Sequence, residues 1–126
     1  MASLEVSPAR GKKDTWFTFT ITDAPIVEIT KPPYAYGPDN HLILYVESPG
    51  NLQVQTMVIT RDIKKANTTM KINPQKEAEA HDVEVPKPVI PGWDRWFCAL
   101  YRPDDFATNG DVLGTPLATC VFILNH

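Results

Sequence analysis

The sequence predicts an all-β protein: an antiparallel β-sandwich of about seven to eight short strands with Greek-key or jelly-roll-like connections, and at most one short helix near residues 74–80. Three observations support this class. Twelve prolines among 126 residues are roughly twice the usual frequency and work against long helices. Apolar runs are short and are separated by proline and glycine turns. Residues 15–22 alternate between apolar and polar, which is typical of a half-buried strand.

The domain organisation follows from the length and from the first residues. A chain of this length builds one domain that folds without disulfides or metals, and we place that domain at residues 14–126. Residues 1–13 are predicted to form a flexible N-terminal arm, because the stretch from Pro8 to Lys13 has chain breakers, three positive charges and no apolar periodicity. In the strand that follows, Phe17, Phe19 and Ile21 share the apolar face.

The middle of the chain predicts strands joined by turns. A short apolar run at residues 26–29 is followed by a loop at 32–40 that is rich in proline and glycine. Residues 41–47 and 52–60 are predicted to form a hairpin around the turn Ser48-Pro49-Gly50-Asn51. These are the strands that the pattern indicates most clearly.

A looser pattern follows between Arg61 and Asp82. Residues 68–72 predict a strand, and Asn73-Pro74 suits the N-cap and first position of a helix. That helix has almost no apolar face, so the segment is either a short solvated turn or disordered. One more short strand is predicted around Val83 and Val85.

Two C-terminal runs, residues 96–101 and 120–124, are apolar at every position, and residues 42–46 share this character. A strand with one solvated face should alternate, because successive side chains point to opposite sides of a sheet. Both faces must therefore be covered, by loops of the chain, by a second sheet plus a helix, or by another subunit. The two C-terminal strands either pair directly or cross between sheets. The predicted interface residues are Ile43, Tyr45, Phe97, Tyr101, Val121 and Ile123, or the alternate face of these strands.

The chain offers few residues for chemistry. Its three histidines are scattered, and no His/Cys pair has zinc-like spacing, so no metal and no cofactor is predicted. No nucleophile elbow or phosphate loop occurs, and no catalytic residue is assigned. Cys98 and Cys120 lie in apolar runs, where free cysteines behave as small hydrophobic residues. The alternative is a disulfide between paired strands, which indicates an oxidising compartment.

One group of loop residues suits a ligand. Aromatic rings beside hydrogen-bonding groups, in loops with proline and glycine, are what a sugar or a peptide requires. The same pattern is also typical of loops that plug the ends of a sandwich core. The residues of this candidate ligand site are Tyr34, Tyr36, Trp93, Asp94 and Arg95.

The function expected from these features is a non-catalytic interaction or assembly protein that forms a homo-oligomer, or binds a protein partner, through an apolar sheet face. A carbohydrate-binding, lectin-like module with a saccharide ligand is the alternative, and an enzyme without a sequence signature is the second alternative. A formal net charge of −3 gives no basic field, so nucleic acid is not an expected partner. No membrane span or targeting segment is seen, which predicts a cytoplasmic protein, or one released without a visible signal peptide.

Overall fold

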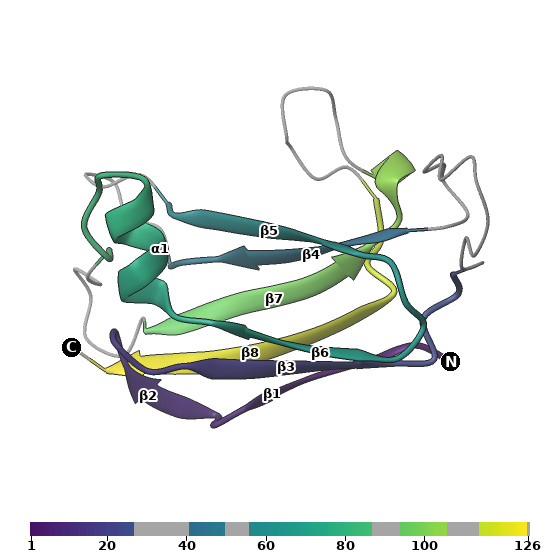
Figure 1. The fold of residues 1–126 in the computed structure, drawn as a ribbon, viewed down its shortest axis with the longest axis horizontal. Helices are drawn as coiled ribbons and strands as arrows, with labels where there is room; N and C mark the ends of the chain where they lie inside the picture. The colour runs from purple at the N-terminus through teal and green to yellow at the C-terminus, as the bar shows by residue number, and fades with distance from the viewer. Residues whose placement is uncertain (27–40, 50–55, 87–93, 106–113, 126) are drawn as a thin grey trace.

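The computed structural model describes residues 1–26, 41–49, 56–86, 94–105 and 114–125. Within these ranges the chain is mostly β, which confirms the predicted all-β class (Figure 1). The strands are β1 (Ser3–Ser7), β2 (Arg10–Lys12), β3 (Phe17–Thr22), β4 (Leu42–Glu47), β5 (Val58–Ile63), β6 (Thr68–Ile72), β7 (Arg95–Tyr101) and β8 (Ala118–Asn125). The helices are α1 (Pro74–Ala80) and a single 3-10 turn, η1 (Pro103–Asp105).

The strands form two sheets, and one of them curls into a half-barrel. The three-stranded sheet has the order β1-β3-β6, and the five-stranded sheet has the order β2-β8-β7-β4-β5. All neighbouring strands are antiparallel except β2 and β8, which are parallel. β7 and β8 pair directly, which resolves the choice between direct pairing and a crossing between sheets.

Residues 1–13, predicted as a flexible arm that is mobile or tied down by a neighbour, contain two paired strands. β1 pairs with β3, from Ser3 opposite Thr22 to Ser7 opposite Thr18. The alternation in β1 turns Leu4 into the core, where it is 5% exposed. β2 then lies along β8 in the other sheet. The sequence pattern did not predict β1, because its two apolar residues, Leu4 and Val6, are followed by a proline and several charges. These two residues are nevertheless enough to pack the strand against the core.

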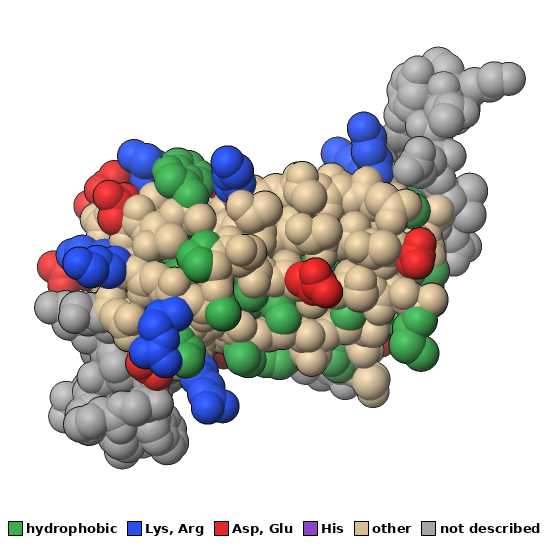
Figure 2. Space-filling model, turned by 90° about the horizontal axis from the view of Figure 1, so that it is seen from below, with side chains coloured by type: hydrophobic (Ala, Val, Ile, Leu, Met, Phe, Trp, Pro, Cys, Tyr) green, Lys and Arg blue, Asp and Glu red, His purple; other side chains and the backbone are tan. Residues whose placement is uncertain are grey.

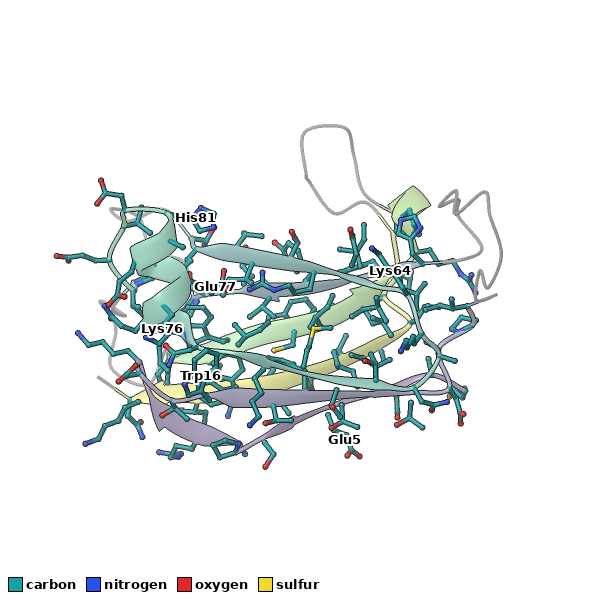
Figure 3. All side chains as sticks on the ribbon, viewed as in Figure 1. Glu5, Trp16, Lys64, Lys76, Glu77 and His81 are labelled. Atoms are coloured by element: carbon teal, nitrogen blue, oxygen red, sulfur yellow. The ribbon has the colours of Figure 1, made fainter. Side chains whose placement is uncertain are left out.

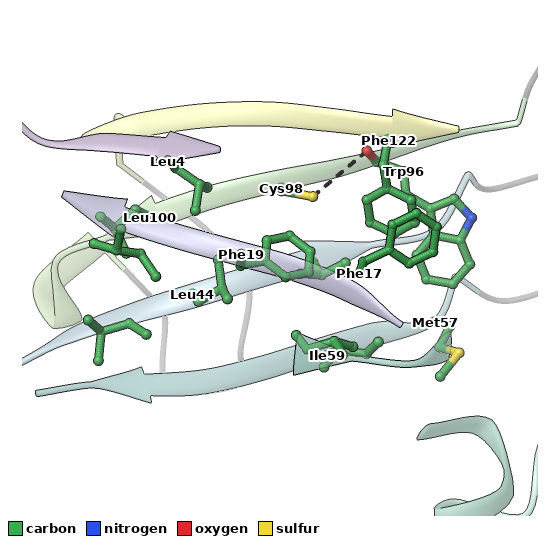
Figure 4. Packing of buried hydrophobic residues seen from close by; sticks show 14 of the residues in the cluster. Leu4, Phe17, Phe19, Leu44, Met57, Ile59, Trp96, Cys98, Leu100 and Phe122 are labelled. Atoms are coloured by element: carbon green, nitrogen blue, oxygen red, sulfur yellow. Dashed lines mark hydrogen bonds between the residues drawn. The ribbon is translucent and has the colours of Figure 1, made fainter. Parts of the chain in front are cut away.

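The hydrophobic core takes side chains from both sheets (Figure 4). From β3 it receives Phe17, Phe19 and Ile21, as the alternation predicts, and each is no more than 1% exposed. From the five-stranded sheet it receives the inward residues of β4, β7 and β8, with aromatic contacts centred on Phe122. One face of each two-sided apolar strand is thus covered by the other sheet.

The hairpin of β4 and β5 differs from the prediction in its register. Glu47 lies opposite Val58, and Leu42 lies opposite Ile63, so the two strands are joined by residues 48–57 and not, as predicted, by residues 48–51 alone. Residues 50–55 lie outside the described residues. Ser48 and Met57 hold this register through two hydrogen bonds. The Ser48 amide donates to the Met57 carbonyl oxygen at 2.9 Å, and the Met57 amide donates to the Ser48 hydroxyl oxygen at 2.7 Å.

The helix α1 begins as the sequence predicts. The side chain of Asn73 accepts a hydrogen bond from the Lys76 amide at 3.0 Å, and Pro74 occupies the first turn. Pro74 and Ala78 are the buried residues of the helix, so two small apolar side chains dock it against the core. Glu77 forms an ion pair with Arg61 of β5.

The strand predicted around Val83 and Val85 is absent. Residues 83–86 form no strand, and the Val83 amide donates to the Ala78 carbonyl oxygen at 2.9 Å, which folds the chain back onto the helix. The run at 26–29, beyond Ile26, and the loop at 32–40 lie outside the described residues.

Replacing Asn73 by alanine is expected to destabilise the protein by about 2 kcal/mol, because the change removes a helix cap and a buried donor. Asn73 is 1% exposed, and its amide nitrogen also donates to the carbonyl and carboxylate oxygens of Asp14, at 3.1 Å each. Urea unfolding followed by circular dichroism measures the loss. Asn73→Asp keeps the acceptor for the Lys76 amide but loses the donor to Asp14. Its free energy of unfolding should therefore differ from that of Asn73→Ala. Equal stability of the two variants and the wild type would refute the capping role.

Candidate functional site

The outer face of the five-stranded sheet brings together all six residues of the predicted interface. Directly opposite residues of paired strands share a face. Ile43 lies opposite Tyr101, and Phe97 lies opposite Val121. Tyr45 lies opposite Ala99, and Ile123 lies opposite Arg95. The interface role of these residues stays a prediction, but their shared face is a property of the register.

Burial divides this face into two parts. At its centre, Tyr45, Tyr101 and Ala99 form a small cluster of their own, in which no residue is more than 8% exposed. The two tyrosine rings meet edge to face, with centroids 6.0 Å apart. Burial raises the pKa of Tyr101, and the nearby carboxylates of Glu47 and Asp105 raise it further. The tyrosines predicted for an interface are therefore already packed within the chain.

The exposed apolar surface lies beside that cluster, in one row across four strands. We call it the Phe97 row, and it consists of Val121 on β8, Phe97 on β7, Glu47 on β4 and Val58 on β5. Val121 is 50% exposed, Val58 45% and Phe97 36%. Ile123 lies next to the row on β8, and Ile43 lies beyond Tyr45 on β4; both are half-buried. Two large apolar side chains, those of Val121 and Phe97, thus reach solvent on neighbouring positions, and Val58 reaches solvent on the far side of Glu47.

Of the predicted ligand site, only Asp94 and Arg95 lie within the described residues. Tyr34, Tyr36 and Trp93 lie outside the described residues. Asp94 is half-buried, and its carbonyl oxygen accepts a hydrogen bond from the Leu124 amide at 3.0 Å. Arg95 is exposed and begins β7. The lectin-like alternative stays a prediction.

A polar surface with an exposed tryptophan lies at the end of the molecule that carries α1 and β2. Most Lys and Arg side chains visible in Figure 2 gather at this end. Trp16 is 50% exposed, and Figure 3 shows it at the same end as Lys76 of α1. The helix is tied to this end by the Gln75 amide, which donates to the Lys13 carbonyl oxygen at 2.9 Å. Lys12, Lys13 and Lys76, which belong to the described residues of this end, are exposed to solvent.

The two cysteines lie on neighbouring strands. Cys98 of β7 and Cys120 of β8 are directly opposite in the ladder, and both face the core. Both are free thiols. Cys98 is fully buried, and its sulfur lies 4.0 Å from the Trp96 carbonyl oxygen (Figure 4). Cys120 is only partly buried. The sequence placed each cysteine in an apolar strand but did not reveal that they face one another.

The part of the chain that the structure describes holds no group of three or more His, Cys, Asp or Glu residues that could bind a metal ion. It also has no helix long and apolar enough to cross a membrane. His41 and His81 stand on different elements, at the start of β4 and at the end of α1.

Comparison with known proteins assigns no family: no family model matches the chain, and neither a curated protein nor a solved structure matches it.

Proposed function

We propose that the two sheets are the layers of an antiparallel β-sandwich, and that this protein is a non-catalytic assembly protein that forms a homodimer through the outer face of its five-stranded sheet. The observation that carries the proposal is the Phe97 row, in which Val121, Phe97 and Val58 are 50%, 36% and 45% exposed on one face. Adjacent exposed apolar side chains are typical of a surface that binds another protein.

The dimensions of the face support a weak dimer. The face spans four strands, β8, β7, β4 and β5. With strands about 4.8 Å apart, about seven residues long and rising about 3.3 Å per residue, its area is roughly 450 Å². Two such faces bury at most about 900 Å² in total, which is below the range of stable interfaces and within that of transient ones. Because Tyr45 and Tyr101 are already buried, the association gains only from the Phe97 row and its flanks. We therefore expect a dissociation constant in the micromolar range or weaker.

The charges on the face also suit two copies of the same surface. Glu47 lies within the Phe97 row, and Arg95 lies on β7 two residues from Phe97, on the same face. A two-fold interface joins a patch to its own copy, so a patch with both signs of charge can pair Arg95 of one protomer with Glu47 of the other. Pairs of this kind set the orientation of the two copies more than they raise the affinity.

Replacing Val121 by lysine is expected to weaken self-association by at least about tenfold, because a charge must then be buried or the face must stay open. Sedimentation velocity over a dilution series, from about 1 mM to about 1 µM, measures the dimer fraction. Thr69→Lys adds the same charge at an exposed position on β6 of the other sheet and should leave the dimer unchanged. A wild-type protein that stays monomeric throughout the series would overturn the proposal, as would equal dimerisation of Val121→Lys.

A further inference from the structure

The Cys98–Cys120 pair meets the geometric requirements for a disulfide. In an antiparallel ladder, directly opposite residues have Cα atoms about 4.5 or 5.5 Å apart, depending on the type of pair. Both separations lie within the range of about 4.4–6.8 Å that disulfides span. The side chains also point the same way, since both belong to the core side of their strands. The Cβ atoms of directly opposite residues lie about 4.5–5.5 Å apart, and those of a disulfide about 3.5–4.5 Å apart, so β7 and β8 must approach slightly for the two sulfurs to bond.

The two thiols differ in solvent exposure and in pKa. These differences give them different roles in an exchange reaction. Cys120 is partly exposed, while Cys98 is fully buried. A hydrogen bond between the two side chains lowers the pKa of Cys120 and raises the pKa of Cys98, and burial raises the pKa of Cys98 further. The thiolate is the attacking form of cysteine. Cys120 is therefore the thiol that reacts first with a reagent from solution, and Cys98 is the thiol that reacts second, with the modified Cys120.

We propose that Cys98 and Cys120 form a thiol–disulfide exchange site whose co-substrate is a small-molecule disulfide of the oxidised-glutathione class. The Cys120 thiolate attacks one sulfur of this disulfide. The S–S bond breaks, one glutathione leaves as a thiolate and takes up a proton, and Cys120 carries the other glutathione. Cys98 then loses its proton, and its sulfur attacks the Cys120 sulfur and releases the second glutathione as a thiol. Two electrons pass from the cysteine pair to the co-substrate.

The site is independent of the proposed dimer. Both cysteines face the core, whereas the Phe97 row is on the opposite face of the same strands. Exchange at one face can therefore fail while association at the other succeeds, and the reverse also holds. The second step should be the slower one, because Cys98 is buried and its thiol holds its proton more tightly.

The test is reaction of the full-length, dilute protein with excess oxidised glutathione, followed by acid quenching and intact-mass spectrometry. The wild type should pass through an adduct with one glutathione and end as an unmodified mass with two hydrogens fewer, and a non-reducing peptide map should link Cys98 to Cys120. Cys98→Ser should stop at the adduct on Cys120. Cys98→Ala provides the same trap with an apolar side chain if the serine unfolds the core. Cys120→Ser should react at least about tenfold more slowly, because only the buried thiol remains.

The control variant moves the accessible thiol to the other face. Thr119→Cys combined with Cys120→Ser places a thiol on an exposed residue of β8, one position away and directed outward. This variant should form the glutathione adduct but no link to Cys98. A wild type that forms no adduct, or stops at the adduct, would overturn the proposal. So would a Cys98 link that forms equally well in the control variant.

The pH dependence of adduct formation tests whether Cys98 lowers the pKa of Cys120, and this test does not depend on a change in folding. In the wild type, the midpoint of the rate profile should lie below the ordinary pKa of a cysteine thiol. In Cys98→Ala the hydrogen bond is lost, and the effects that remain on the pKa of Cys120, burial and the charge of Glu5, both raise it. The midpoint should therefore move up. An unchanged midpoint would contradict the assignment of Cys98 as the partner of Cys120.

Discussion

Replacing Phe122 by alanine is expected to lower the free energy of unfolding by about 4 kcal/mol, the largest effect that we anticipate for a single residue of this protein. Phe122 is 2% exposed and lies at the centre of an aromatic group that joins the two sheets. Its ring centroid is 4.2 Å from that of Phe17 and 6.1 Å from that of Phe19, both on β3. It is also stacked on Trp96 of β7, with centroids 5.5 Å apart. Truncation removes all three ring contacts and leaves a cavity between the sheets.

Thermal unfolding should show this loss as a fall of roughly 15 °C in Tm, on the scale expected for a domain of this size. Urea unfolding followed by tryptophan fluorescence gives the free energy itself. Val121→Ala is the matched control, because Val121 is the next residue of the same strand, points to the opposite face and is 50% exposed. At protein concentrations too low for association, it should cost no more than about 0.5 kcal/mol. Similar losses for the two variants would contradict the placement of Phe122 in the core.

The local pattern predicted the strands whose apolar residues form long or regular runs. β3 appears where alternation placed it, with Phe17, Phe19 and Ile21 buried. β4, β7 and β8 appear in the apolar runs, and α1 begins at the expected Asn73 cap. In these segments, the side chains that define the pattern are also the side chains that the core buries. Local sequence and tertiary environment therefore agree.

Non-local pairing could not be predicted from the sequence. β1 offers only Leu4 and Val6 as inward residues, and two apolar positions before a proline do not distinguish a strand from a tail. The register of β5 depends on the bonds between Ser48 and Met57, which no turn pattern reveals. The register of a strand depends on the side chains of the strand that it pairs with, and a single sequence does not show which strands pair.

For the candidate sites too, local alternation predicted some features, and contacts between strands decided the others. The three strands present their predicted interface residues on a common face because of their register. Alternation within β4, β7 and β8 was enough only to place the residues of each strand on one side of that strand, because the period of a strand is two residues. It could not predict that Tyr45 and Tyr101 pack over Ala99 while Phe97 stays exposed, since that difference arises from contacts between strands. The facing of Cys98 and Cys120 is likewise a matter of register.

Forming the Cys98–Cys120 disulfide is expected to stabilise the protein by about 3 kcal/mol, because the bond closes a loop of roughly 20 residues in the unfolded chain. On the scale for this domain size, the oxidised form should unfold roughly 10 °C above the reduced form. The comparison is made on one preparation, with and without a reducing agent, by calorimetry at equal protein concentration. Cys120→Ser in the same two conditions should show no difference, which separates the disulfide from effects of the reagent.

The sign of this effect tests the geometry of the ladder. A disulfide stabilises when the folded strands already hold its ends at bonding distance, since its main effect is then on the unfolded chain. If the bond instead strained the core, the strain would fall on Trp96 and Phe122, which flank the two cysteines on the same face and are directly opposite one another. The oxidised protein would then unfold at or below the temperature of the reduced one. That result would show that β7 and β8 do not hold the two sulfurs ready to bond, and it would count against Cys98 and Cys120 as an exchange site.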